Sequence, residues 1–302
     1  MARIGVLGLH PTANITGPEP RSASTRALIG GLRELGYVYG QHYVTEARGA
    51  DARPERFPAL VAELIGLRVD IIVAPGPALP ALKQATSSIP VVMSASPDPV
   101  AQGLVNSLGR PGGNFTGLSL QSVETTGKRL ELLREAAPSA PAVGVLWNQA
   151  SLLNWRAAET ASRERRWKAL SLEIREVGEV ESALKVAAGA GAGAILVFAA
   201  GLLFPHERRV TELMARNRLP AMYELRTYVE AGGLMSYGAD ITDVWRRAAV
   251  YVDKILKGTN PRDLAIEQPT EFELVINIKT ARALGLTLAQ SLLVRADEII
   301  DR

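Results

Sequence analysis

Short apolar segments alternate with helical segments along this chain, and the alternation runs through twice. The first series of expected strands comprises Arg3–Leu9, Tyr43–Ala47, Val69–Ala74, Pro90–Met93 and Phe115–Leu118. The second series comprises Ala142–Trp147, Leu172–Val177, Ala194–Phe198 and Pro220–Tyr223. Strands that alternate with helices pair in parallel and carry helices on both faces of the sheet. We therefore expect an α/β fold of two doubly wound parallel-sheet lobes.

The helices of the second series are expected at Glu124–Ala136, Leu152–Leu170, Val180–Ala188 and Pro205–Asn217. The clearest helix follows them, because Asp240 is a good N-cap residue and apolar residues then recur at helical spacing as far as Gly258. A strand (Phe272–Ile276), a helix (Lys279–Leu284) and a polar tail remain. This remainder is too small for a third domain, so we expect the chain to return to the first lobe and cross once more. The expected lobes are 1–118 plus 238–266 and 119–237 plus 267–302.

Composition excludes several classes of protein. The 302 residues are 47% hydrophobic and 22% charged, as in an ordinary globular protein with a large core. Net charge is only +3, and the basic cluster 163–168 lies on an expected helix with an acid among it, so we expect no nucleic-acid partner. The absence of cysteine excludes disulfides and thiol catalysis. The uncharged run Val186–Phe204 is rich in glycine and predicts a helix end, a strand and a loop rather than a membrane span.

No motif for catalysis or cofactor binding is present in the sequence. The three histidines are scattered and form no metal-binding pattern, the segment 126–129 lacks the glycine and hydroxyl residues of a P-loop, and Gly5 and Gly8 form no dinucleotide fingerprint. We expect no catalytic residue, no cofactor and no bound metal. Met1–Arg3 leads straight into the first strand, so we expect no signal peptide here; an exported protein would be a processed form with an added Met.

Five stretches resemble one protein family in collinear order over nearly the whole chain. They are GLRELGY (Gly31–Tyr37), DPVAQGLVNSLGRPGGNFTGLS (Asp98–Ser119), GKRLELLREAAP (Gly127–Pro138), GGLMSYGADITDVWRRAAVYVDKILKGTNPRDL (Gly232–Leu264) and EQPTEFELVINIKTARALGLTLAQSLLVRADEII (Glu267–Ile300). The sequence resembles the ABC-transporter substrate-binding protein family, whose characterised members include tryptophan- and phenylalanine-binding proteins.

The resemblance implies a type I periplasmic-binding fold with three crossovers and a ligand cleft between the lobes. It implies a solute-binding receptor of an ABC importer that closes on a small carboxylate-bearing ligand, such as an amino acid, aromatic ones included, or an aromatic acid. The implied partners are this ligand and a membrane permease, the implied location is periplasmic or extracytoplasmic, and we expect a monomer. A ligand-sensing domain of a regulatory or signalling system on the same fold is the alternative, and an enzyme is the weaker one.

Candidate ligand contacts in the first lobe follow strands, where open α/β sheets bind ligands. They are Thr12, Asn14, Pro75, Gly76, Pro77, Ala78, Ser94, Ser96 and Asp98. The loop 10–20 is unusually long for the family. The turn 75–78 is typical of either an anion site or a plain tight turn. Ser94 and Ser96 could donate to a ligand carboxylate and Asp98 could contact an ammonium, but loop hydroxyls and a turn cap are open alternatives.

Candidate contacts in the second lobe lie at the ends of strands or flank the second crossing between the lobes. They are Trp147, Asn148, Phe198, Tyr223, Glu224, Tyr237 and Asp240. Aromatic walls would suit an apolar or aromatic ligand, although Trp147 fits the core equally well. The loop 198–204 lacks the acidic residue that the resemblance leads us to expect there. Asp240 is expected to cap the following helix, with pairing to a ligand amine as the alternative.

Overall fold

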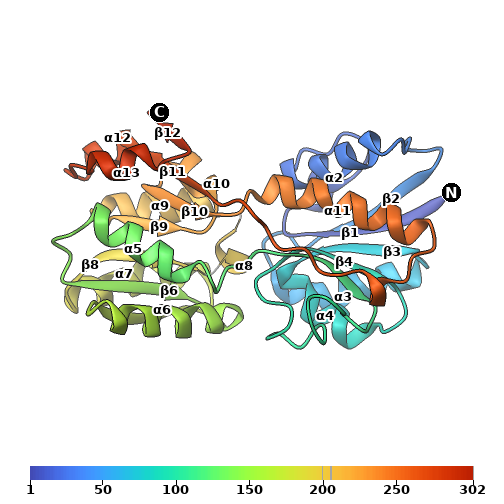
Figure 1. Ribbon diagram of the computed structural model, residues 1–302, viewed down its shortest axis with the longest axis horizontal. Helices are drawn as coiled ribbons and strands as arrows, with labels where there is room; N and C mark the ends of the chain where they lie inside the picture. The colour runs from blue at the N-terminus through green and yellow to red at the C-terminus, as the bar shows by residue number, and fades with distance from the viewer. Residues whose placement is uncertain (199, 205, 302) are drawn as a thin grey trace. The chain divides into compact units, whose positions relative to one another are not determined.

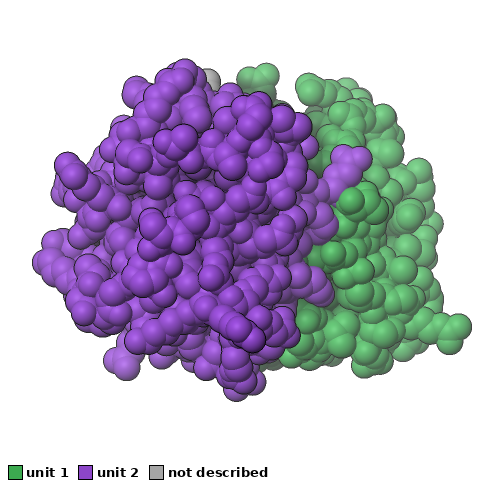
Figure 2. All heavy atoms as spheres, turned by 60° about the vertical axis from the view of Figure 1, so that its left-hand side comes forward, with its two compact units in different colours: residues 1–121, 241–270 green, residues 122–240, 271–302 purple. Residues whose placement is uncertain are grey.

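The computed structural model describes residues 1–198, 200–204 and 206–301 and divides the chain into two compact units (Figures 1 and 2). Unit 1 comprises Met1–Gln121 and Ile241–Thr270, and unit 2 comprises Ser122–Asp240 and Glu271–Arg302. The chain therefore passes between the units three times. Each boundary lies a few residues beyond the position expected from the sequence.

Unit 1 is built on a five-stranded parallel sheet. Its strands are β1 (Ala2–Gly8), β2 (Tyr43–Gly49), β3 (Ile71–Pro75), β4 (Val91–Ser96) and β5 (Phe115–Ser119), in the order β2-β1-β3-β4-β5. All residues of β3, β4 and β5 are buried, as expected where helices cover both faces of a parallel sheet. The register shifts near the ends of β3 and β4, where two of the candidate loops begin.

The helices of unit 1 come from both ends of the unit's sequence. They are α1 (Thr12–Ile15), α2 (Ala23–Glu34), α3 (Phe57–Gly66), α4 (Leu79–Ala85) and α11 (Ile241–Leu256), with short 3-10 turns at Pro54–Arg56, Gly76–Ala78 and Pro261–Asp263. A Cβ atom added at Gly31 would lie 2.4 Å from the Arg246 carbonyl oxygen and 2.9 Å from the Ala249 Cβ. The close packing of α2 on α11 therefore depends on this glycine. This packing joins the second stretch of unit 1, Ile241–Thr270, to the first.

Unit 2 repeats this arrangement and extends it. Its strands are β6 (Ala142–Trp147), β7 (Lys168–Glu173), β8 (Ala192–Val197), β9 (Ala221–Tyr223), β10 (Met235–Gly238), β11 (Glu273–Asn277) and β12 (Glu298–Ile300), in the order β12-β11-β10-β9-β8-β6-β7. Strands β6 to β10 are parallel and follow the order of unit 1. Strand β11 is antiparallel to β10, and β12 is parallel to β11, so the last segment extends the sheet at one edge.

The helices of unit 2 lie on both faces of its sheet. They are α5 (Thr126–Ala136), α6 (Leu152–Glu164), α7 (Val180–Gly189), α8 (Ala200–Leu203), α9 (Glu207–Arg216), α10 (Arg226–Glu230), α12 (Ile278–Ala283) and α13 (Gln290–Val294), with 3-10 turns at Gln149–Ser151 and Val177–Glu179. Val143 and Val145 share a core with α5 and α6, whereas a Cβ at Gly144 would face Ala187 of α7. A core thus lies on each side of β6.

Two expectations for unit 2 were wrong. The helix expected to reach Leu170 ends at Glu164, because Arg166 has a φ of +51° and residues from Lys168 onward pair with β6. The indole nitrogen of the buried Trp167 donates to the Ala140 carbonyl at 2.9 Å, which fixes this turn. The supposed polar tail contains α13 and β12. The helix expected from Pro205 begins at Glu207, and Pro205 itself lies outside the described residues.

In the part of the chain that the structure describes, every helix is too short or too polar to traverse a lipid bilayer.

Candidate ligand-binding residues

Three predicted ligand-binding residues of unit 1 form hydrogen bonds within that unit. Ser94 Oγ donates to the Ala74 carbonyl at 3.1 Å, and Ser96 Oγ donates to Gln102 Oε1 at 2.9 Å. Both serine side chains are fully buried. Asp98 Oδ1 accepts from the backbone N–H groups of Val100 and Ala101, at 3.1 and 2.9 Å. These are the loop and turn-capping roles that stood as alternatives, and a ligand role for the three residues stays a prediction.

The Pro75–Ala78 turn packs closely on β4. A Cβ atom at Gly76 would lie 2.7 Å from the Ala95 carbonyl oxygen, so only glycine fits at that position without a shift of the backbone. Gly76 and Ala78 are buried, and Pro77 is half-buried. Packing of the turn on the neighbouring strand therefore accounts for the glycine, and anion binding by this turn stays a prediction.

The first loop is attached to the end of β2. Thr12 Oγ1 accepts from the Gly49 N–H at 2.9 Å, and the Asn14 carbonyl accepts from the Ser22 N–H at 2.8 Å. A Cβ at Gly49 would lie 2.1 Å from the His10 carbonyl oxygen. The Thr12 hydroxyl thus helps to position the loop, while the Asn14 side chain is half-buried.

Trp147 and Phe198 belong to the core of unit 2. The Trp147 indole nitrogen donates to Ser171 Oγ at 2.8 Å, and its ring stacks on Trp155 with the centroids 5.9 Å apart. Phe198 is 1% exposed. Asn148, half-buried, accepts through Oδ1 from Ser151 Oγ at 3.1 Å. The structure therefore gives both aromatic residues a packing role, and a ligand role for them is untested.

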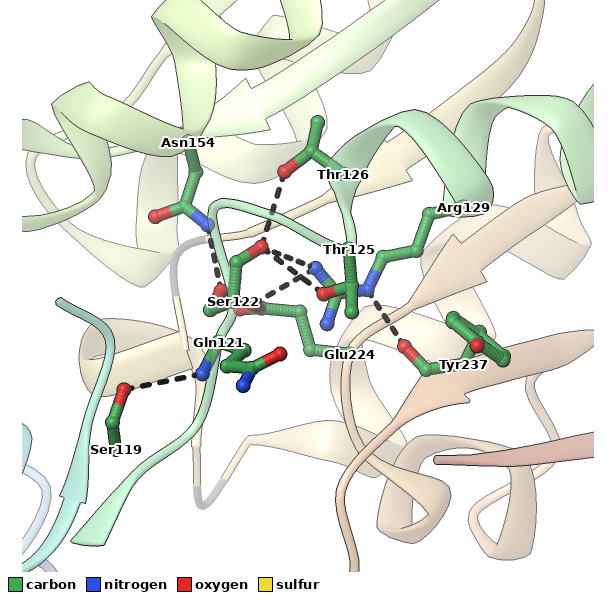
Figure 3. A network of polar contacts seen from close by, with 9 residues as sticks. All are labelled: Ser119, Gln121, Ser122, Thr125, Thr126, Arg129, Asn154, Glu224 and Tyr237. Atoms are coloured by element: carbon green, nitrogen blue, oxygen red, sulfur yellow. Dashed lines mark hydrogen bonds and ion pairs between the residues drawn. The ribbon is translucent and has the colours of Figure 1, made fainter. Parts of the chain in front are cut away.

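Glu224, directly after β9, belongs to a polar network around Arg129 (Figure 3). Arg129 Nη1 lies 3.4 Å from Glu224 Oε1, and the two side chains are 2% and 13% exposed. Ser122 Oγ donates to the same oxygen, Oε1. Asn154 Nδ2 donates to Ser122 Oγ at 2.6 Å. Three segments that are distant in sequence, around 122–129, 154 and 224, thus meet in one network.

Burial and pairing shift the pKa values of Glu224 and Arg129 in opposite directions. Burial raises the pKa of Glu224, while the charge of Arg129 and the hydrogen bond from Ser122 lower it. Burial lowers the pKa of Arg129, while Glu224 raises it. Burial is the larger effect on both groups, so the pKa of Glu224 is raised and that of Arg129 is lowered, and each charge offsets only part of the desolvation of the other.

Tyr223 and its neighbours form a second polar group on the other face of β9. The rings of Tyr223 and Tyr228 stack with centroids 4.8 Å apart. Both hydroxyls, and that of Ser236, are buried and have no hydrogen-bond partner among the described residues. Burial raises the pKa of Tyr223 and of Tyr228. Hydroxyls in this state carry a desolvation cost that a partner would offset.

Tyr237 and Asp240 lie at the end of unit 2's first segment. The Tyr237 carbonyl accepts from Arg129 Nε at 2.7 Å, and its ring stacks on Phe272 with centroids 5.9 Å apart. Asp240 directly precedes α11, and its charge contributes to a raised pKa of Glu273, for which burial is the larger cause. Of the unit 2 candidates, Trp147 and Phe198 thus belong to the core and Glu224 and Tyr237 to the Arg129 network.

Arg129, Ser122 and Asn154 were missed in the sequence. The signal was present for Arg129, because it stands at helical spacing from the buried Leu133 and Ala136 and so belongs to the inner face of α5. An arginine on an inner face requires a buried acceptor, but the sequence does not show which acid supplies it. Within the described residues, no group of three or more acidic, histidine or cysteine side chains is placed to bind a metal.

Comparisons with known proteins agree on one family. The family model described as ABC transporter substrate binding protein matches residues 14–300. A tyrosine-binding protein of Clostridioides difficile (strain R20291) is 25% identical over 265 residues, covering 86% of this chain and 76% of the relative.

Solved structures show the same fold. A conserved domain protein from Vibrio cholerae has a TM-score of 0.89 at 25% identity, with 99% of each chain covered. An ABC domain from Streptococcus pneumonia in complex with L-Trp has a TM-score of 0.87 at 24% identity, again with 99% of each chain covered. Both are similar to this chain in fold along their full length. The family match over residues 14–300 leads to one conclusion. The chain belongs to the ABC transporter substrate-binding protein family.

Proposed function

We propose that this protein is the amino-acid receptor of an ABC importer. Family membership makes it a substrate-binding protein, and the tyrosine-binding relative directs the choice of substrate toward amino acids. The observation that carries the proposal within the structure is Glu224. Its carboxylate stands at the carboxyl end of a parallel strand and is oriented by Arg129 and Ser122.

Glu224 is placed to receive the ammonium group of an amino acid. Ser122 Oγ donates to Oε1 of its carboxylate, and we assign the ammonium to the other oxygen, Oε2. An acceptor held by neighbouring groups binds an ammonium without first losing side-chain entropy. We assign the ammonium contact to Glu224, while the contacts of the ligand's carboxylate stay among the predicted residues of unit 1.

The mechanism is binding and release rather than turnover. The chain passes between its units at 121/122, 240/241 and 270/271, which provides three connecting segments about which the units could move. A ligand shifts such an equilibrium only through its preference for one state, so we propose that residues of both units contact it in a closed form. We propose that a membrane permease recognises that form and that the protein works outside the cytoplasm.

The test is thermal unfolding of the purified protein against the common L-amino acids and aromatic acids. A specific ligand at 100 times its dissociation constant adds about 2.7 kcal/mol to the free energy of unfolding. For L-tyrosine, the matched controls are tyramine, which lacks the carboxylate, and 3-(4-hydroxyphenyl)propionic acid, which lacks the ammonium. Stabilisation by one or a few L-amino acids, but by neither control, supports the proposal. No stabilisation by any amino acid contradicts it.

A further inference from the structure

Arg129 binds the two ends of unit 2's first segment at once (Figure 3). Its Nη1 donates to the Ser122 carbonyl at 2.8 Å, and its Nε donates to the Tyr237 carbonyl at 2.7 Å. Ser122 is the first residue of unit 2 after the 121/122 passage, and Tyr237 lies shortly before the 240/241 passage. One side chain thus joins the starting points of two connecting segments.

The surroundings leave this arrangement little freedom. The Ser122 carbonyl also accepts from Thr126 Oγ1 at 3.1 Å. A Cβ atom at Gly238 would lie 2.0 Å from the Glu224 carbonyl oxygen, so the end of β10 lies directly against the end of β9. The guanidinium is covered by the Phe198 ring, whose centroid is 5.8 Å from its central carbon. A planar guanidinium held on several sides is a rigid connector.

Glu224 is the only acid paired with Arg129 among the ion pairs of the described residues. A change in the charge or position of the Glu224 carboxylate therefore changes the balance of forces on the guanidinium. Because the same guanidinium holds Ser122 and Tyr237, such a change reaches both connecting segments within a few bonds.

We propose that Arg129 is a positioning residue that couples ligand contact at Glu224 to the two connecting segments at 119–125 and 236–241. The inference rests on the proposed function, since it takes Glu224 as the ligand's ammonium partner. Arg129 does not contact the ligand itself. It fixes the carboxylate for binding and transmits its state to the segments about which the units move.

The experiment compares the variants R129M and R134M by hydrogen exchange and calorimetry. Arg134 is a matched control, because it lies on the same helix, donates to the Arg165 carbonyl and covers the Trp167 ring, 5.6 Å from its centroid. The probes are L-tyrosine, L-tryptophan and L-phenylalanine. The double variant R129M/E224Q removes both charges, and its amide exchange in ligand-free protein replaces that of R129M if R129M leaves too little folded protein.

In ligand-free protein, R129M should speed amide exchange at both connecting segments by about tenfold or more, because charge-assisted hydrogen bonds are lost. R134M should leave the exchange rates of both segments unchanged. A bound probe should slow exchange at both segments in wild type and R134M but not in R129M. Its affinity should fall about tenfold or more in R129M and stay within about twofold in R134M.

Two results separate the two proposals. If the wild type binds a probe and a folded R129M protein keeps wild-type affinity and wild-type exchange at either segment, the coupling is overturned while the proposed function stands. If the wild type binds no amino acid of the full panel, the proposed function fails, and the coupling fails with it.

Discussion

The Arg129 guanidinium and the Glu224 carboxylate form a buried ion pair, with Nη1 and Oε1 3.4 Å apart. Helix α5 supplies the arginine, and the end of β9 supplies the acid. Ion pairs in such places stabilise a fold only when their hydrogen-bonding groups are also satisfied, and here Ser122 and two backbone carbonyls satisfy part of them: Glu224 Oε1, Arg129 Nε and Arg129 Nη1. The carboxyl edge of unit 2 is therefore held in one arrangement before any ligand arrives.

Asp98 provides a test between capping and ligand binding. Because its carboxylate accepts from two backbone N–H groups, D98A should lower the free energy of unfolding by about 1 kcal/mol. D98N should leave stability nearly unchanged, since asparagine caps equally well. With the ammonium assigned to Glu224, amino-acid affinity should be the same in both variants. A selective loss of affinity in D98N, measured by calorimetry, would return the ammonium to Asp98.

Tyr228 carries a buried hydroxyl with no partner among the described residues. Y228F removes this group while keeping the ring that stacks on Tyr223, so the free energy of unfolding should rise by up to about 1 kcal/mol. Y251F is the control, because the Tyr251 hydroxyl donates to the Ala265 carbonyl at 2.9 Å, and its removal should lower stability. Urea unfolding measures both. A destabilised Y228F would show that the hydroxyl is satisfied in solution.

Gly31 is required where α2 packs on α11. A Cβ there would lie 2.4 Å from the Arg246 carbonyl oxygen, so G31A should destabilise unit 1 by about 1–3 kcal/mol as an overpacking change. G30A is the matched control on the same helix, because a Cβ at Gly30 meets nothing within 4 Å. It should stabilise the protein by up to about 1 kcal/mol through helix propensity. Equal effects of the two variants would contradict the packing of α2 on α11.

The raised pKa of Tyr43 predicts that the protein loses stability at alkaline pH. Burial is the main cause that raises its pKa from 10.0 to about 12, with Tyr39 adding to the increase and Arg33 opposing it. A group whose pKa is raised on folding contributes stability below its unfolded pKa, and that contribution is lost as pH rises through the folded value. The free energy of unfolding should therefore fall between pH 10 and 12, and it should fall less in Y43F. Identical pH profiles for the two proteins would refute this.

Strand positions could be read from the sequence because each is a short apolar run. The expected bounds of strands β1, β4 and β6 lie within a few residues of the observed ones, because burial on both faces of a sheet requires a nearly continuous run of apolar residues. Strand β12 and helix α13 were missed because they are short and lie at an exposed edge, where the apolar pattern is weak. The junction of α6 and β7 was missed because its turn depends on a buried Trp167 that reads equally well as a helix residue.

The candidate site was harder to predict than the fold. Glu224 was named because it follows a strand, a rule that needs only local sequence, and Tyr237 because it flanks the second crossing between the lobes. Their connection through Arg129 is tertiary, since it joins segments that the sequence keeps far apart. The need for glycine at Gly238 could not be predicted either. A Cβ atom there would lie 2.0 Å from the Glu224 carbonyl oxygen, and this contact is visible only in the structure.

The central claim is that this chain binds an amino acid. Isothermal titration calorimetry of the purified protein with the amino acid that stabilises it most tests this directly. We expect one ligand per chain, a dissociation constant in the micromolar range or tighter, corresponding to about −8 kcal/mol or better, and much weaker binding by E224Q. Absence of binding by every L-amino acid at millimolar concentration, or unchanged affinity in E224Q, would contradict the account.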